Sequence, residues 1–337
     1  GELSYKEDEV PTFPHVYYAP NYKWEAGKLV LKEGKAAGTD EYIEGKANIT
    51  PNGQGINVSF TDATRNYSRL RIATMPNKQI TVAINKYIPA GSSSMEWFQD
   101  IALTSDEKGN AYLYGTFVRY FDFEVKYEGA PLASHTFYQA AENAKSYALD
   151  ATVVSLADEG ITYDQIVEDV KKELDAGKTY INLMLAPDVD EETLEAIHIG
   201  LAGASNGTIN LTLIGCKKIP SGGFMYWKML KSIALPDVTE IAEKAFLDCT
   251  RLQKVVLGNL TKVYGKAGEK GIFEGCRTKD IDLVLSKDQK VMNGGETEGG
   301  YCWTADITKD YSGSDEHNGR VFLDYDFQSI TCGYPVP

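Results

Sequence analysis

Two stretches in the second half of the chain carry the same order of apolar and polar positions, 22 residues apart. Residues 230–249 read LKSIALPDVTEIAEKAFLDC, and residues 208–227 read TINLTLIGCKKIPSGGFMYW. The apolar positions of the two stretches coincide at five pairs: Leu211/Ile233, Leu213/Leu235, Cys216/Val238, Ile219/Ile241 and Phe224/Phe246. A third copy follows 22 positions later, with apolar residues at Leu252, Val255, Leu257, Leu260 and Val263. In that copy Phe273 and Cys276 come five positions late, so it contains an insertion.

A period in the low twenties, with apolar residues at i, i+3 and i+5, is typical of a leucine-rich-repeat solenoid. Each repeat adds one strand, about 4.8 Å from the last, so aligned side chains are expected to stack in ladders. We expect three such ladders: Leu213, Leu235 and Leu257; Ile219, Ile241 and Val263; and Phe224, Phe246 and Phe273.

The segments that flank the three copies predict the ends of this solenoid. Residues 161–177 form an amphipathic pattern with Thr162 as N-cap and Gly177 as the stop, which predicts a covering helix. Residues 178–207 resemble a longer first repeat, whose helix begins after Asp190. A further strand is expected at residues 280–288, and a closing strand at 321–330 within an irregular C-terminal cap. We therefore expect residues 161–337 to form one repeat domain.

The first part of the chain has a different period. From about residue 28 to 129, short runs alternate apolar and polar side chains, which predicts about eight antiparallel strands. Turn residues separate them at 51–53, 76–78 and 106–110, the last of which we interpret as a hairpin turn. We expect residues 1–131 to form a β-sandwich, with jelly-roll and immunoglobulin-like topologies both open. Residues 132–160 are either a linker or ambiguous in structure, because residues 136–149 are compatible with a short helix and residues 151–157 with a strand. The predicted fold class is thus mainly β (α+β).

Charge and hydropathy narrow the possible partners. The 337 residues carry a formal net charge of −14, which argues against nucleic acid or an anionic membrane as the main partner. No apolar run approaches the ~20 residues of a transmembrane helix. Gly1 stands where a Met would begin a natural chain, so we expect a removed targeting segment upstream.

Candidate catalytic and metal-binding residues are sparse. No nucleophile, zinc or phosphate-binding motif appears, so we expect no catalytic residue and no cofactor, although carboxylates on distant strands would leave no spacing signal. Acidic clusters lack the spacing of a calcium loop, and we interpret them as helix caps or solvated surface. His198 is expected to have a packed or solvent-edge role rather than a catalytic one. Three of the five cysteines, Cys216, Cys249 and Cys276, are expected to be buried thiols, whereas Cys302 and Cys332 are either paired or free.

Aromatic residues offer the strongest hint of a ligand. Tyr17, Tyr18 and Trp24 near the start of the chain, and Trp97 after a flexible loop, are candidate ligand contacts. Flat exposed aromatic rings on a β-sandwich suit sugar rings, but aromatic residues also fill the spaces between strands. In the repeats, residues 225–227 (MYW) form either a partner-binding patch or a plug of the convex side.

The repeat unit also resembles a known family. The pattern in residues 230–249, with Ala245, Phe246 and Cys249 at its end, resembles the BspA-like leucine-rich repeats of cell-surface proteins of Bacteroides-type bacteria. The copy before it departs from this pattern, with Gly223 in place of Ala and Trp227 in place of Cys. The resemblance covers about residues 160–337. It implies surface display, often as a lipoprotein, and a role in adhesion or protein binding.

We therefore expect a monomeric bacterial protein that is not an enzyme. It is expected to be secreted or to lie on the outer cell surface, either free or lipid-anchored through a removed N-terminal segment. Its expected partner is a protein or a host or matrix component, with glycan binding through the sandwich as the alternative. The apolar repeat positions are used for stacking. Recognition is therefore expected at the exposed strand positions, at the insertion of residues 264–271, or on the sandwich.

Overall fold

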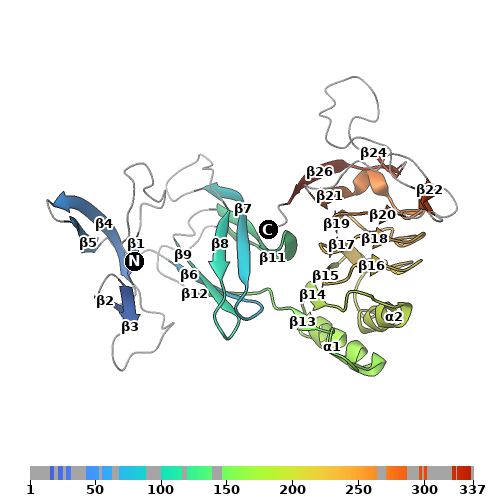
Figure 1. Cartoon of the computed structure of the whole chain (residues 1–337), viewed down its shortest axis with the longest axis horizontal. Coiled ribbons are helices and arrows are strands. Elements are labelled where there is room, and N and C mark those ends of the chain that lie inside the picture. The colour runs from blue at the N-terminus through green and yellow to red at the C-terminus, as the bar shows by residue number, and fades with distance from the viewer. Residues whose placement is uncertain are drawn as a thin grey trace, which may run out of the picture.

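The computed structural model shows a mainly β protein, with two α-helices and several sheets among the residues it describes (Figure 1). The described residues are 16–18, 22–25, 28–31, 43–52, 55–62, 68–88, 100–115, 120–138, 146–263, 271–286, 296–297, 300–301, 321–323 and 325–334. The mainly β class expected from the sequence is confirmed.

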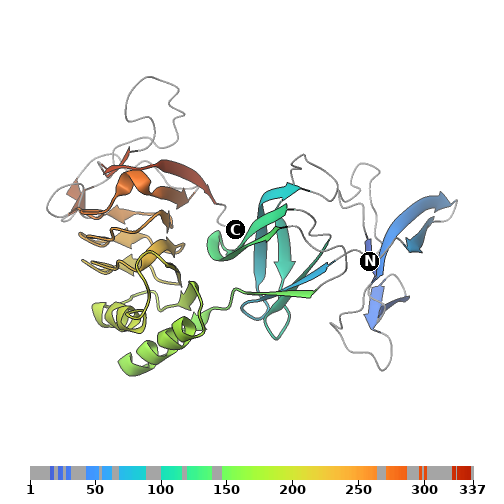
Figure 2. The ribbon, with the colours of Figure 1, turned by 180° about the vertical axis from the view of Figure 1, so that it is seen from behind.

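A parallel sheet of seven strands runs through the second half of the chain. Its strands, in spatial order, are β13 (Val154–Ser155), β14 (Tyr180–Met184), β15 (Ile209–Ile214), β17 (Leu230–Leu235), β19 (Lys254–Leu257), β21 (Asp282–Ser286) and β26 (Ser329–Tyr334). A second parallel sheet joins the two-residue strands β16 (Lys218–Ile219), β18 (Glu240–Ile241) and β20 (Lys262–Val263). Figures 1 and 2 show these strands stacked one above another.

The 22-residue period of the sequence is the period of the strand pairing. Leu211 pairs with Ile233, and Ile233 pairs with Val255. Leu235 pairs with Leu257, and in the short sheet Ile219, Ile241 and Val263 lie side by side. Each of these side chains is buried. The alignment of the three copies is therefore confirmed for these strand positions.

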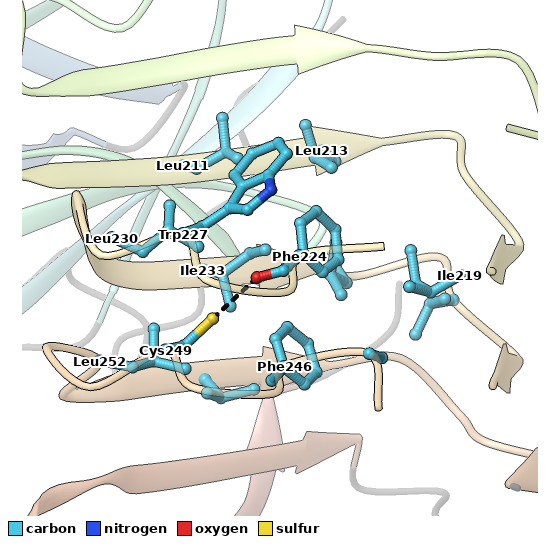
Figure 3. Packing of buried hydrophobic residues seen from close by; sticks show 14 of the residues in the cluster. Leu211, Leu213, Ile219, Phe224, Trp227, Leu230, Ile233, Phe246, Cys249 and Leu252 are labelled. Atoms are coloured by element: carbon cyan, nitrogen blue, oxygen red, sulfur yellow. Dashed lines mark hydrogen bonds between the residues drawn. The ribbon is translucent and has the colours of Figure 1, made fainter. Parts of the chain in front are cut away.

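The phenylalanine ladder is confirmed as well. Phe224 stacks on Phe246 (Figure 3), with ring centroids 5.3 Å apart. Phe246 in turn stacks on Phe273 at 5.1 Å. The insertion before Phe273 therefore leaves its ring in place. Because all three rings are fully buried, the ladder is a central part of the core of the repeats.

Two helices cover the start of this core, as the sequence predicts. Helix α1 (Tyr163–Asp175) begins with a capping box between Thr162 and Gln165, and the chain leaves it at Gly177, whose φ is +78°. Helix α2 (Glu191–Gly200) begins at its N-cap Asp190. The two helices touch closely at Gly200, where a Cβ atom would lie 2.7 Å from the Cβ of Val170. Apolar side chains of both helices belong to the core of the repeats.

The C-terminal segment covers the end of the repeat core that lies opposite the two helices. The single strand expected at residues 321–330 is instead divided into β24 (Val321–Phe322), β25 (Tyr325–Asp326) and the start of β26. The division lets Phe327 and Tyr325 set their ring edges against Phe273, with centroids 5.3 and 5.9 Å away. The last phenylalanine of the ladder is thus covered by aromatic rings. The short helix η1 (Thr278–Asp280) precedes β21, whose position confirms the strand expected at residues 280–288.

The first half contains two sheets that share one core. One has the order β11 (Ala130–Tyr138), β10 (Tyr120–Tyr127), β7 (Gln79–Ile88), β8 (Ile101–Thr104). The other has the order β12 (Ser146–Asp150), β6 (Ser68–Ala73), β9 (Asn110–Gly115). Buried side chains of both sheets, such as Ile72, Val82 and Phe123, form the common core.

Smaller sheets complete the described strands. A three-stranded sheet joins β1 (Val16–Tyr18), β4 (Ile43–Asn52) and β5 (Gly55–Asp62), and β2 (Tyr22–Glu25) pairs with β3 (Lys28–Leu31). Near the C-terminal end β22 (Glu296–Thr297) pairs with β23 (Gly300–Tyr301).

Four expectations for the first half were wrong. Residues 132–138, expected in a linker, belong to β11, and residues 146–149, expected in a helix, lie in β12. Leu132, Ala133 and Phe137 are buried in the shared core, so burial overrides the helical propensity of this stretch. Strand β12 pairs with β6 in parallel, so the sheets are not wholly antiparallel. The turn at 106–110 does not close a hairpin, because β8 pairs with β7 whereas β9 pairs with β6.

Candidate functional site

The seven-stranded sheet presents two rows of side chains on the face that points away from the repeat core. Register pairs join the members of each row across the strands. The first row, called here the polar row, consists of Tyr180, Asn210, Ser232, Lys254, Asp282 and Ser329. The second row, called here the covered row, consists of Asn182, Thr212, Ala234, Val256, Val284 and Thr331.

Apart from its exposed end at Thr331, the covered row lies beneath the start of strand β11. The Thr212 hydroxyl donates to the carbonyl of Pro131 at 2.7 Å, and Asn182 Nδ2 donates to the carbonyl of Leu132 at 2.9 Å. Ala130 is completely buried against Ala234 and Val256. Figure 2 shows β11 beside the sheet. These central strand positions, which the sequence pattern leaves outside the core and open to recognition, are therefore occupied by the protein itself.

The polar row remains half-exposed beside this contact. Its members already hold one another in place: Ser232 Oγ donates to Asn210 Oδ1 at 2.8 Å, and Ser329 Oγ donates to Asp282 Oδ1 at 2.5 Å. Asn210 Nδ2 also donates to the carbonyl of Thr179. The side chains are thus fixed, yet each keeps hydrogen-bonding capacity, because carboxylate and hydroxyl oxygens accept more than one bond.

Two side-chain contacts join the polar row to the four-stranded sheet of the first half. The Ser134 and Tyr180 hydroxyls lie 2.7 Å apart, and Lys254 Nζ lies 3.2 Å from Glu124 Oε1. Glu124 also pairs with Lys126 on its own strand at 3.3 Å. Burial acts to raise the pKa of Glu124, but the two ammonium groups outweigh it and the pKa is lowered. The carboxylate is therefore held in its charged form at the junction.

From this junction the outer face of β10 and β11 continues toward a pair of tyrosines. Register pairs place Glu124 opposite Ser134, Asp122 opposite Thr136, and Tyr120 opposite Tyr138, all on one face. The Thr136 hydroxyl donates to Asp122 Oδ1 at 2.7 Å. The rings of Tyr120 and Tyr138 meet edge to face at 5.8 Å, and Lys86 Nζ lies 5.0 Å from the centroid of Tyr120. Tyr138 is 71% exposed.

A second candidate surface is the turn at residues 225–227, where the structure separates the three side chains. Trp227 is buried, with its ring stacked on His198 at 4.8 Å and edge-on to Phe224. Met225 and Tyr226 point outward, 37% and 50% exposed. Trp227 is therefore the plug, and Met225 with Tyr226 is the surface patch. Burial lowers the pKa of His198, although the nearby carboxylate of Glu195 acts to raise it. This agrees with the packed position of the ring against Trp227.

The ligand contacts suggested by the sequence lie elsewhere. Tyr17 and Tyr18 belong to β1 in the three-stranded sheet, whereas Trp24 belongs to the β2–β3 pair, so the strands do not bring them into one sheet. Trp97 lies outside the described residues. The insertion at residues 264–270 and Cys302, the possible disulfide partner of Cys332, also lie outside the described residues. Glycan binding through Tyr17, Tyr18, Trp24 and Trp97 remains a prediction.

Metal binding and thiol chemistry find little support in the described part of the chain. No group of three or more potential ligands gathers there. Asp190, in the acidic cluster at 188–192, instead caps helix α2 by accepting from the Thr193 amide at 2.8 Å. Cys216 and Cys249 are free and buried, as expected, and Cys276 is free and half-buried. Burial raises the pKa of Cys216 to about 12, which makes it unreactive.

Sequence reasoning missed the tyrosine pair and the polar row. The alternation in residues 120–127 places Phe121, Phe123 and Val125 inside, and so implies that Tyr120 and Asp122 face outward. Tyr138 lies within the stretch whose residues favour a helix, so the pattern does not predict its outward position on a strand. The contacts between the halves join residues 46 to 130 positions apart, so no local pattern reveals them.

Comparison of the chain with protein-family models, with curated proteins and with solved structures finds no match. Within the described ranges, neither helix has the length and apolar character needed to cross a membrane.

Proposed function

We propose that this chain is a non-enzymatic binding protein of the bacterial cell surface, with a β-sandwich followed by a short BspA-like leucine-rich-repeat solenoid. The paired strands at a 22-residue period and the stacked phenylalanines support the solenoid. The two sheets that share a core support the sandwich. Surface display and secretion rest on the resemblance of the repeat unit to surface proteins.

The observation that carries protein binding is the backbone of Tyr226. Its φ is +66°, in the left-handed region that costs an ordinary residue about 1–2 kcal/mol. The same position in the next two copies is held by Asp248, with φ +56°, and Gly275, with φ +73°. Asp and Gly tolerate this conformation far better than a bulky tyrosine does. The first copy thus places a large ring where the fold would favour a small residue.

Within the described part of the chain, the Tyr226 side chain makes no core contact that would offset the cost of its backbone conformation. Its ring is half-exposed, and its neighbour Met225 is exposed too, so neither side chain fills the core. The turn itself is held firmly: the Tyr226 amide donates to the carbonyl of Leu247, and the Met225 amide donates to that of Gly222, both at 2.8 Å. A fixed, exposed Tyr–Met pair is suited to protein contact, because tyrosine is enriched at hot spots and methionine adapts to varied surfaces.

The proposal is tested by binding measurements on the full chain with a panel of immobilised extracellular-matrix and serum proteins. Tyr226→Gly removes the ring and relieves the strained backbone, so the variant should be at least as stable as the parent while its binding falls at least tenfold. Asp248→Gly is the matched control, since it also places glycine at the left-handed position of the turn, in the next copy, but removes no aromatic ring. Equal binding by the parent and Tyr226→Gly would contradict the proposal, as would failure of the parent to bind any protein in the panel.

A further inference from the structure

We infer that the polar row and the tyrosine pair together form a binding surface for a neutral oligosaccharide, at the junction of the two halves. This surface is separate from the Tyr226 turn and takes a different class of ligand. It is independent of the aromatic residues near the start of the chain. Three properties support it: an exposed aromatic ring, a row of bidirectional hydrogen-bonding groups, and balanced charge.

The exposed ring is Tyr138. A sugar presents a flat array of C–H bonds on one face, which packs well against an aromatic face. Tyr138 is the most exposed of the large apolar side chains in the described part of the chain. Its ring is oriented by the edge-to-face contact with Tyr120, and Lys86 in turn lies over the Tyr120 ring. The platform is thus held in place before any ligand arrives, which lowers the entropic cost of binding.

The hydrogen-bonding groups suit hydroxyls. A sugar hydroxyl donates one hydrogen bond and accepts others, so it is matched by amide, hydroxyl and carboxylate groups in alternation. The polar row supplies such a series in Asn210, Ser232, Asp282 and Ser329, and Asp122 with Thr136 supplies a further pair beside the tyrosines. A peptide with large apolar side chains would find no match in the polar row, because the apolar positions beside it are buried under β11.

The charges on this surface decide between classes of glycan. Asp122, Glu124 and Asp282 would repel a uronic-acid polymer or a sulfated one. Lys254 and Lys86 would repel an amino sugar that carries a positive charge. Glu124 and Lys254 largely neutralise each other at the junction through their ion pair. A neutral sugar avoids both penalties.

The dimensions indicate an oligosaccharide rather than a single sugar. From Asn210 to Ser329 the polar row crosses four gaps between strands, which at about 4.8 Å each is roughly 19 Å. Along β11, Tyr138 lies four residues beyond Ser134, which adds about 14 Å at the rise of a strand. The contacts Ser134–Tyr180 and Glu124–Lys254 make the two parts continuous.

Affinity electrophoresis of the full chain in gels that contain neutral polysaccharides (xyloglucan, glucomannan, starch or mixed-linkage β-glucan) tests the inference, with polygalacturonate as the anionic comparison. At least one neutral polysaccharide should retard the protein, and polygalacturonate should not. Titration calorimetry with oligosaccharides of the retarding polymer should then show that Tyr138→Ala and Asp282→Ala each weaken binding at least tenfold. If Asp282→Ala proves unstable, Asp282→Asn at unchanged melting temperature replaces it.

Tyr226→Gly provides the control, because it also removes an exposed tyrosine but should leave glycan binding intact. Conversely, Tyr138→Ala should leave protein binding at the Tyr226 turn intact, so the two proposals fail separately. The inference is overturned if no neutral polysaccharide retards the parent protein, if only polygalacturonate does, or if Tyr138→Ala binds the oligosaccharide as the parent does.

Discussion

The Cys249 thiol donates a hydrogen bond to the main-chain carbonyl of Phe224, which lies one copy earlier in the chain, with 3.0 Å between Sγ and the oxygen (Figure 3). Cys276 makes the same contact with the carbonyl of Phe246, at 2.9 Å. The Ala-Phe-x-x-Cys element of the sequence is therefore a device that ties each copy to the one before it. The first copy has Trp227 in place of Cys, and Trp227 instead stacks on His198 of helix α2.

Replacing Cys249 by Ala should destabilise the protein by about 1–2 kcal/mol, from the lost hydrogen bond and the small cavity left behind. Cys249→Ser, which keeps a donor of similar size, should cost less. Urea unfolding measures both free energies, and an alanine variant as stable as the parent would show that the thiol contact contributes nothing.

Phe246→Asp should unfold the repeats cooperatively. Phe246 lies between Phe224 and Phe273, so a buried carboxylate there breaks both stacks and is left without a partner. Phe246→Leu, the control, should keep the fold at a cost of a few kcal/mol. A thermal transition of Phe246→Asp unchanged from the parent would contradict the role given to the phenylalanine ladder.

Ala234→Glu should separate the two halves. Ala234 is 2% exposed under Ala130, so a carboxylate there must either be buried or displace β11, at a cost of several kcal/mol. Calorimetry should then show two transitions instead of one. Thr331→Glu is the matched control, because Thr331 lies in the same row but is exposed. If both variants melt like the parent, the covered row does not hold the halves together.

Acid should weaken the junction through Glu124. Its pKa in the folded protein is lowered from the ordinary value of 4.5, so its contribution to stability is complete above that value. The contribution is lost as the pH falls through the lower, folded pKa, because the unfolded chain then takes up the proton more readily. Urea midpoints measured between about pH 7 and pH 3 should fall more steeply for the parent than for Glu124→Gln. Parallel curves for the two proteins would exclude this ion pair as a source of stability.

Much of the second half could be predicted because its pattern is local and repeated. The 22-residue period gave the register of strands such as β17 and β19, and Thr162 and Asp190 gave the starts of both helices. These features depend on neighbours in sequence or on identical neighbours one period away. The insertion before Phe273 did not obscure the ladder, because Phe and Cys return together after it.

The first half and the candidate site were less accessible to prediction. The segment from Ala130 to Asp150 has helix-forming residues at its centre. On one side of that centre Phe137 is buried in the core, and on the other side Leu149 packs partly buried against it. Only tertiary contacts decide its strands. The polar row follows from the register, but its junction with Glu124 and Ser134 depends on how the halves dock, for which the chain offers no local signal.

The presence of Trp227 where the later copies have cysteine also determines how a chain of this kind can grow. A duplicate of residues 230–251 placed between the second and third copies could form the thiol-to-carbonyl hydrogen bond with both neighbouring copies. It would lengthen the stack by one strand. The same duplicate placed before Thr208 would meet His198 with Cys249 instead of a tryptophan ring, and helix α2 would lose its aromatic partner. Gene duplication can therefore extend this stack from its middle, while the end that adjoins the helices stays fixed.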